Sequence, residues 1–454
     1  MAQQNRFLPI TETVWPYRGS DQQSHYGEAM IEIAYTKRRI AKCVNYSDLI
    51  DDKSLLDRAN RDAAALRALN AINNDTLFQK NLTSLKIRGK QAFACANIEQ
   101  TLVTRLISKN IKANYKIRVQ NRNTIIKNLI SSLRESSPYN IHRFDIESFF
   151  ESVNREKLFA KLMNDDRCSR QTLLLIYQLF EQIKAQGIFG LPRGIGLSST
   201  LSELALHDFD SVIKQQKNIF FYARFVDDII LITSPELQKG EVIELLETNL
   251  QFDLKLHKVG KKISHHNISK ASDKNSLKNA ALERLQYLGY VFSVFNNSTQ
   301  SDKILGISRR QLKIDICEEK VEKIKSRLIS SFTNHISNST APGSFDLLEM
   351  RIRALTGNYI INDPSTNISI KTGIYYNYSE KNNRVQCPLK ELDAFLRGLL
   401  FSGHHQLSLR IQSKISLDKR RKLIGYTFTD GFYNARLHFL KHDDLRKIKE
   451  VWKK

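Results

Sequence analysis

The stretch IFFYARFVDDIILIT spans residues 219–233 and carries the strongest signal in the chain. Two apolar runs with the length and aromatic content of buried β-strands flank a Val-Asp-Asp step, with no loop between them. This pattern predicts a tight hairpin with Asp227 and Asp228 at its tip. Two adjacent carboxylates between apolar strands are costly unless cations neutralise them. We therefore expect a cation site here, since a solvated surface hairpin would need a polar strand face that these flanks lack.

The setting of this aspartate pair distinguishes it from the other Asp-Asp pairs of the chain. Pairs also occur at residues 51–52, 165–166 and 443–444, in polar, loop-like or helix-start surroundings that are typical of solvated surface. Only the pair at 227–228 is embedded in apolar strands.

A further carboxylate occurs in a similar setting upstream. The run HRFDIESFF (142–150) has Asp145 near the end of an apolar strand, just before a turn into a helix. Two-metal phosphoryl transfer needs acidic ligands from different elements that converge on ions about 3.5–4 Å apart. One ion would activate the attacking 3′-hydroxyl, and the other would hold the triphosphate and the leaving pyrophosphate. Hard oxygen ligands imply two Mg²⁺ ions, with Mn²⁺ as a substitute.

The charge balance indicates a polyanionic partner. The 454 residues include 70 Lys plus Arg against 47 Asp plus Glu, a formal net charge of +23. Such a surplus favours nucleic acid, because each phosphate contact releases condensed counterions. A mitochondrial or ribosome-associated protein that is basic for other reasons is the alternative.

Composition also bounds the compartment. The five cysteines form no CxxC pair, which disfavours a zinc ribbon or a disulfide framework. The N-terminus lacks the apolar core of a secretory signal, and no stretch approaches eighteen uninterrupted apolar residues. We expect a cytoplasmic protein without a membrane partner.

Periodicity predicts the class of the fold. Residues 28–135 have mostly helical spacing, and from about residue 138 short apolar strands alternate with helices, which indicates an α+β catalytic core. Asn154 is a predicted N-cap for the helix NREKLFAKLM (154–163), and Thr200 with Glu203 a predicted capping box for TLSELALHDFDSVIKQ (200–215).

Three further segments complete this outline. The polar segment 262–280 predicts a surface loop with solvated His265 and His266, and residues 316–333 predict an amphipathic helix with a lysine face. Beyond Pro342–Gly343 lies a separate, mainly helical stretch.

Five motifs resemble those of reverse transcriptases, in the same order, over roughly residues 110–335. DIESFF (145–150) resembles motif A, and FVDD (225–228) is similar to the YxDD box of motif C, with Phe in place of Tyr. GLPRGIGLSS (190–199) resembles motif B, LKLHKVGKK (254–262) motif D, and YLGY (287–290) the primer grip of motif E.

The resemblance implies an RNA-directed DNA polymerase, a nucleotidyltransferase with a right-hand architecture of fingers, palm and thumb. It divides the chain into an N-terminal helical region with the start of the fingers (1–110), a fingers–palm core (111–300), a thumb helix region (301–340) and a mainly helical C-terminal domain (341–454). It also implies RNA template, DNA product and dNTPs as ligands.

The resemblance assigns roles to individual residues. The metal set is Asp145, Ile146, Asp227 and Asp228. Phe150 corresponds to the steric gate against a ribose 2′-hydroxyl, although packing beside Phe149 explains it equally well. The remaining assignments are triphosphate contacts from Arg118 first, then Lys116 and Arg122; substrate contacts from Arg193 and Gly194; a primer grip of Tyr287, Leu288, Gly289 and Tyr290; and a motif D lysine at Lys258, Lys261 or Lys262.

Glycines provide a physical interpretation of motif B beside the resemblance. Without a Cβ, the backbone at Gly190, Gly194 and Gly196 could lie flat against a nucleotide or template base. An ordinary glycine-rich turn before the following helix is compatible with the same pattern.

Departures within motif B narrow the resemblance. Arg193 stands where Gln is usual and Gly196 where Pro is common, and the run is most similar to prokaryotic abortive-infection and defence-associated reverse transcriptases. DNA synthesis in antiviral (phage) defence on a cognate non-coding RNA, with a partner protein or a homo-oligomer, is the leading hypothesis. The alternatives are template-independent or protein-primed synthesis, with Tyr375, Tyr376 and Tyr378 as candidate primers, and a catalytically degenerate RNA-binding scaffold.

Overall fold

The structure of the protein is a computed structural model, which describes residues 34–87, 89–260, 263–269, 281–295, 304, 309–362, 369–384, 387–440 and 442–452. These residues belong to a single compact unit. The predicted motif D lysines Lys261 and Lys262 lie outside the described residues.

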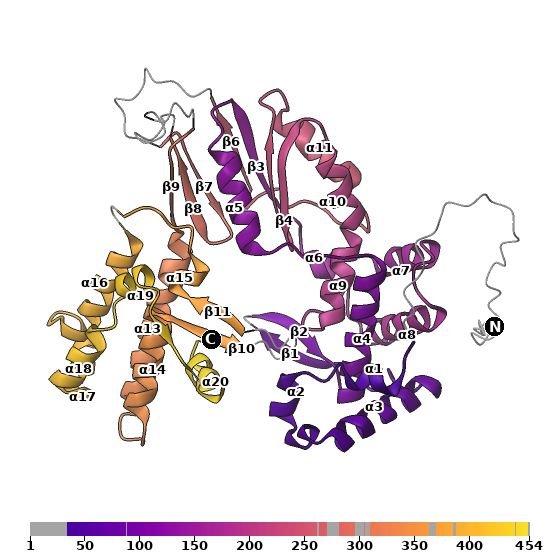
Figure 1. The fold of residues 1–454 in the computed structure, drawn as a ribbon, viewed down its shortest axis with the longest axis horizontal. Helices are drawn as coiled ribbons and strands as arrows, with labels where there is room; N and C mark the ends of the chain where they lie inside the picture. Colours follow the sequence, from indigo (N-terminus) through magenta and orange to yellow (C-terminus); the bar gives the residue numbers. More distant parts are fainter. Residues whose placement is uncertain are drawn as a thin grey trace, which may run out of the picture. The chain divides into compact units, whose positions relative to one another are not determined.

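A central four-stranded antiparallel sheet in the order β4-β5-β3-β6 carries the aspartates (Figure 1). Its strands are β3 (Tyr139–Asp145), β4 (Ile219–Phe225), β5 (Asp228–Thr233) and β6 (Ser264–Ile268). Every residue of β5 is buried. Successive strand side chains point to opposite faces, so Ile229 and Leu231 enter one hydrophobic core while Ile230 and Ile232 enter another. The uninterrupted apolar run of β5 follows from burial on both faces.

The first core packs mostly helices against one face of this sheet. These helices are α1 (Lys37–Ala41), α3 (Arg58–Asn73), α4 (Ile98–Asn114), α6 (Phe149–Ser152), α7 (Arg155–Asn164), α8 (Arg170–Ala185), α9 (Gly196–Ala205), α10 (His207–Lys214) and α11 (Lys239–Asn249). The short helix α2 (Tyr46–Asp51) and the 3₁₀ helix η2 (Lys53–Leu56) lie between α1 and α3 in the sequence.

The two predicted helix starts have different outcomes. The side chain of Asn154 accepts a hydrogen bond from the Lys157 backbone, so the predicted N-cap of α7 is confirmed. The predicted capping box is wrong, because α9 begins at Gly196, four residues before Thr200, and ends before Leu206, which separates it from α10. Thr200 is instead buried with its hydroxyl bonded to that of Ser108.

Three strands correct the sequence prediction. A hairpin of β1 (Thr83–Ile87) and β2 (Lys90–Ala94) interrupts the region predicted as mostly helical, and Gly89, with φ of 76°, lies in its turn. His265 and His266 belong to β6 rather than to a loop. The β6 pairing draws His265 to within 3.1 Å of His142, Nδ1 to Nδ1, and His266 binds Glu283 at 2.8 Å.

The second core joins the other face of the sheet to the C-terminal half of the chain. It includes α5 (Arg122–Leu133), the antiparallel sheet β7-β8-β9 and α13 (Glu318–Ser337). The three strands are β7 (Glu283–Tyr287), β8 (Tyr290–Val294) and β9 (Leu312–Ile316). The amphipathic helix predicted at 316–333 is present as α13, and its Val321, Leu328 and Phe332 are buried.

The stretch from residue 341 onward, here called the C-terminal module, shares this second core with α13. It is mainly helical as predicted, and it also contains a small sheet in the order β11-β10-β12. Its elements are α14 (Ser344–Thr356), β10 (Asn358–Asn362), β11 (Ser369–Gly373), α15 (Ile374–Asn377), α16 (Pro388–Phe401), α17 (Gln406–Lys414), α18 (Leu417–Ile424), α19 (Phe428–Tyr433), β12 (Leu437–His438) and α20 (His442–Glu450).

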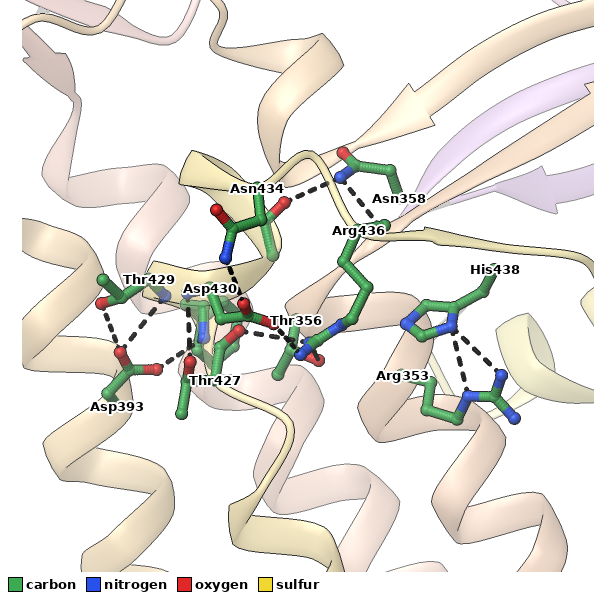
Figure 2. Close-up of polar contacts among 12 residues, drawn as sticks. Arg353, Thr356, Asn358, Asp393, Thr427, Thr429, Asp430, Asn434, Arg436 and His438 are labelled. Carbon is green, nitrogen blue, oxygen red and sulfur yellow. Dashed lines mark hydrogen bonds and ion pairs between the residues drawn. The ribbon is translucent and has the colours of Figure 1, made fainter.

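A polar network stabilises the centre of this module (Figure 2). Asp393 accepts hydrogen bonds from the backbone amides of Phe428 and Thr429 at the start of α19. Asn358 of β10 donates to the carbonyls of Gly431 and Arg436. These bonds tie α16, α19 and β10 together.

Candidate active site

The strand register brings the three predicted aspartates to one end of the central sheet. Asp145 lies opposite Asp228 in the β3–β5 pair, and Phe225 lies opposite Asp228 in the β4–β5 hairpin. The hairpin turn therefore consists of Val226 and Asp227. The Ile146 amide donates to the Asp227 carbonyl at 3.0 Å, which fastens the turn to the chain after Asp145.

The hairpin turn is strained. Val226 has φ of 63°, and Asp227 has no positive φ, the pattern of a type II′ turn in which Gly is the usual first residue. A positive φ is costly for a β-branched side chain, and such strain gathers at functional sites.

The predicted motif D segment flanks Asp145 on its other side. The His257 amide donates to the Asp145 carbonyl at 2.8 Å, and the Glu147 amide donates to the Lys255 carbonyl at 2.9 Å. Ile146 forms an isolated antiparallel bridge with Leu256. The backbone of Asp145 and Ile146 is thus held between two neighbouring segments.

Asp228 has a partner that the sequence interpretation missed. Arg143, two residues before Asp145 on β3, donates from Nε to Oδ1 at 2.8 Å and from Nη2 to Oδ2 at 2.7 Å. The two residues are only 8% and 6% exposed. Burial would lower the pKa of Arg143, but the hydrogen bond and charge of Asp228 outweigh it, and the pKa is raised.

Two of the three aspartates at this site are suited to binding a divalent ion. Within the described ranges, His, Cys, Asp and Glu side chains form no group of three or more arranged to hold a metal ion. Asp228 is already neutralised by Arg143. Asp145 and Asp227 are half-buried carboxylates at the end of the sheet and fit a hard cation. The full metal set of Asp145, Ile146, Asp227 and Asp228 stays a prediction.

A cavity of about 530 Å³ opens beside the hairpin tip. Four elements line this cavity: the carboxylate hairpin, the helix after Asp145, the predicted motif B loop and the β7–β8 turn. The lining residues include Asp227, Asp228, Arg143, Phe150, Arg193, Leu288, Gly289 and Lys320.

The predicted primer grip forms the turn between β7 and β8. Leu288 and Gly289 both have positive φ, 45° and 86°, as a type I′ turn requires. The rings of Tyr287 and Tyr290 are buried, at 1% and 0% exposure, so they belong to the core. The Tyr287 hydroxyl donates to the Asp228 carbonyl at 3.2 Å, which joins this hairpin to the carboxylate hairpin.

Phe150 and Arg193 lie together at the cavity wall. The Arg193 guanidinium lies 5.1 Å from the centre of the Phe150 ring and forms an ion pair with Glu151. That pair and the nearby Asp227 raise the pKa of Arg193. Phe150 is half-buried and also packs against the first core, so both interpretations of this residue are compatible with its position.

Two of the motif B glycines have an internal role that corrects the sequence interpretation. A Cβ at Gly190 would clash with the Phe150 carbonyl, and one at Gly194 would clash with the Phe93 carbonyl of β2. These positions therefore need glycine because protein backbone lies against them. Gly196, the first residue of α9, has open space around its Cβ position.

The predicted triphosphate contacts are only partly gathered at the site. Arg118 is exposed and lines a small cavity of about 40 Å³ beside Val226. Lys116 is exposed and lines neither of these cavities. Arg122 lines the cavity of about 530 Å³, where its guanidinium binds the Leu288 and Asn377 carbonyls.

Arginines in apolar strands were the signal that sequence reasoning overlooked. A buried charge must be paired. Arg143 in NIHRFDI and Arg224 in NIFFYARFV lie within apolar strands, so each of them predicts an acidic partner nearby. Arg224 binds Glu203 at 2.7 Å and Asp210 at 2.8 Å. This second buried cluster lies directly behind Val226, whose carbonyl Arg224 also binds.

Residues 82–292 match the family model described as "Reverse transcriptase (RNA-dependent DNA polymerase)". The chain contains a reverse transcriptase domain. The domain extends from the β1–β2 hairpin to β8 and includes the three aspartates and the Leu288–Gly289 turn. The match supports the resemblance of this part of the chain to reverse transcriptases.

Other comparisons add little to this domain. No curated protein matches the chain. Among solved structures, apo telomerase from Candida tropicalis is similar with 10% identity and a TM-score of 0.34, covering 82% of this chain and 61% of that one. Telomerase from Candida albicans in complex with a fragment of telomeric RNA gives 10% identity and a TM-score of 0.32, covering 83% and 65%. The chain thus spans less than two thirds of these relatives, and likenesses this weak carry no argument about its function.

None of the described helices combines the length and the apolar composition needed to cross a bilayer.

Proposed function

We propose that the protein adds deoxynucleotides to a primer strand on an RNA template by two-metal phosphoryl transfer. The observation that carries the proposal is the register, within the reverse transcriptase domain, of Asp145 opposite Asp228 with Asp227 in the adjoining turn. In this proposal the central sheet is the palm, the β1–β2 hairpin and the helices of the first core form the fingers, and α13 is the thumb.

The proposed division of labour follows from the contacts. Asp145 and Asp227 would hold the divalent ions, and these ions would supply activation of the 3′-hydroxyl and stabilisation of the pyrophosphate. Arg143 fixes Asp228 beside them. Phe150, held by the Arg193 guanidinium at the cavity wall, limits the space beside the incoming sugar. Asp227 and Asp228 line a cavity that the β7–β8 turn also lines, where the primer terminus would lie.

The proposed partners are polyanions, in keeping with the formal charge of +23. RNA serves as template and DNA as product. The departures of motif B at Arg193 and Gly196 support a role in phage defence with a cognate non-coding RNA.

Protein priming finds no support in the position of the candidate tyrosines. Tyr378 is buried, and burial raises its pKa to about 12, which disfavours it as a nucleophile. Tyr375 packs its ring against Phe432 at 5.6 Å, and Tyr376 is half-buried beside it.

The test is incorporation of labelled dNTPs by the purified protein with its co-purifying RNA and Mg²⁺. Asp145→Asn and Asp227→Asn should each abolish product, whereas Asp51→Asn, in an exposed Asp-Asp pair, should retain full activity. Wild-type protein without metal-dependent product, or equal product from all variants, would contradict the proposal and favour an RNA-binding scaffold.

A further inference from the structure

The C-terminal module lies outside the residues 82–292 that match the reverse transcriptase model. It nevertheless contacts the β7-β8-β9 sheet, which carries the proposed primer grip, at two separate places. The contacting segment is residues 374–383, which includes α15 and the chain that follows it.

Arg122 forms the first contact. Its Nε and Nη2 donate to the Leu288 carbonyl at 3.1 and 2.6 Å, and its Nη1 donates to the Asn377 carbonyl at 2.8 Å. Leu288 has φ of 45°, an unfavourable backbone conformation that needs external support. The planar guanidinium presents donors in a fixed fork, so it can hold both carbonyls at once. A lysine could not reproduce this geometry.

Two tyrosines reinforce the same junction. The Tyr290 hydroxyl donates to the Asn377 carbonyl at 3.2 Å, and the Tyr290 and Tyr378 rings meet edge to face at 5.6 Å. The Arg122 guanidinium lies 5.0 Å from the Tyr290 ring centre and 5.8 Å from that of Tyr378. Arg122, Tyr290 and Tyr378 therefore form one cluster, and Arg122 connects this cluster to the turn.

The position of α15 is set by the interior of the module. The Tyr375 amide donates to Asn358 Oδ1 at 2.9 Å, and the Ile374 amide donates to the Gly357 carbonyl at 3.1 Å. Figure 2 shows that Asn358 in turn belongs to the network with Arg436. A shift of the module would therefore shift Asn377 and the turn that it supports.

The second contact covers the edge of β9. The Ile314 amide donates to Asn382 Oδ1 at 2.8 Å, the Asn382 amide donates to the Ile314 carbonyl at 3.1 Å, and Asn382 Nδ2 donates to the Leu312 carbonyl at 2.9 Å. Exposed strand edges have unpaired backbone groups. Asn382 satisfies them, and so extends the sheet into the module.

We propose that the C-terminal module is part of the primer-binding apparatus, with Arg122 as the positioning residue that transmits its position to the Leu288–Gly289 turn. This turn lines the cavity beside the carboxylates, and Arg122 lines the same cavity. The inference rests on the proposed function, because it takes the β7–β8 turn as the contact for the primer strand.

The experiment uses the full chain and approaches the junction from both sides. Arg122→Gln removes the fork, Arg122→Lys keeps the charge alone, and Asn382→Ala removes the cover of β9. Lys127→Gln, at an exposed position of the same helix α5, is the matched control for charge. Binding of a fluorescent DNA–RNA primer–template duplex is measured by anisotropy, and KM for duplex, KM for dNTP and kcat by incorporation.

We expect Arg122→Gln, Arg122→Lys and Asn382→Ala to raise the Kd and the KM for duplex by about tenfold, the size of one or two lost hydrogen bonds. The KM for dNTP and kcat at saturating duplex should change less than twofold, and Lys127→Gln should behave as wild type. Hydrogen exchange of the amides at 287–290 should accelerate in the three variants. Unchanged exchange and duplex affinity, or equal losses in every parameter, would overturn the inference. If the wild-type protein binds the duplex but incorporates no nucleotide, the proposed function is wrong. The anisotropy and hydrogen-exchange results of the variants still test the role of the C-terminal module in that case.

Discussion

The buried pair of Arg143 and Asp228 gives a prediction with a defined magnitude. Its two side chains are 10% and 9% exposed and lie 2.7 Å apart. Arg143→Gln would leave the Asp228 carboxylate buried without its counter-charge, at a cost of about 3–5 kcal/mol in folding free energy. The double variant Arg143→Gln/Asp228→Asn should recover most of this loss, because two neutral partners can still share a hydrogen bond.

The matched control is the ion pair of Arg67 and Glu99. It has the same separation of 2.7 Å, but the Arg67 side chain is 60% exposed. Because solvent screens an exposed pair, Arg67→Gln should change stability by less than about 1 kcal/mol.

Urea denaturation measures the free energy of unfolding of each variant. Native-state hydrogen exchange of the β5 amides measures the local stability around Asp228. The reasoning would be refuted by an Arg143→Gln variant as stable as wild type. It would equally be refuted by a double variant no more stable than Arg143→Gln alone.

Three further predictions concern other parts of the chain. Gly190→Ala should raise the KM for dNTP and destabilise the fold by about 1–3 kcal/mol, because its φ of 57° and the Phe150 carbonyl exclude a Cβ; Gly196→Ala, with open space, should be neutral in the same kinetic and thermal assays. Burial first, and then the charge of His265, lower the pKa of His142 from its ordinary value of about 6.5 to about 3 in the folded protein. Below about pH 6.5 the unfolded chain therefore binds a proton at His142 that the folded protein does not bind. The free energy of unfolding should fall as the pH drops through this range. In urea titrations from pH 7 to 4, His142→Gln should show a shallower fall, and an identical slope would exclude this role. Asp393→Ala should cost about 1–3 kcal/mol and speed amide exchange at Phe428 and Thr429, which lose their acceptor; unchanged exchange would contradict the network of Figure 2.

Local patterns were sufficient for the carboxylate hairpin. Residues 229–232 of β5 are all apolar because both faces of the strand are buried, and the absence of a loop between the strands left room only for a two-residue turn. The amphipathic spacing of α13 and the Asn154 cap were equally local signals. These features need no information from distant residues.

The missed features depend on partners far along the chain. The β6 strand exists because β3 pairs with it, although its sequence is polar and carries His265 and His266. Arg143 reaches Gln286 as well as Asp228, and Arg122 reaches Asn377, contacts that no local pattern contains. Gly190 appeared suited to a nucleotide because the Phe150 backbone that fills its space is 40 residues away in sequence.

The most direct test of the account is a crystal of the protein with primer–template duplex, a dNTP and Mn²⁺, recorded at the manganese absorption edge. The account predicts two anomalous peaks about 3.5–4 Å apart within ligand distance of Asp145 and Asp227. Peaks elsewhere, or a bound duplex and dNTP with neither carboxylate on a metal ion, would contradict it.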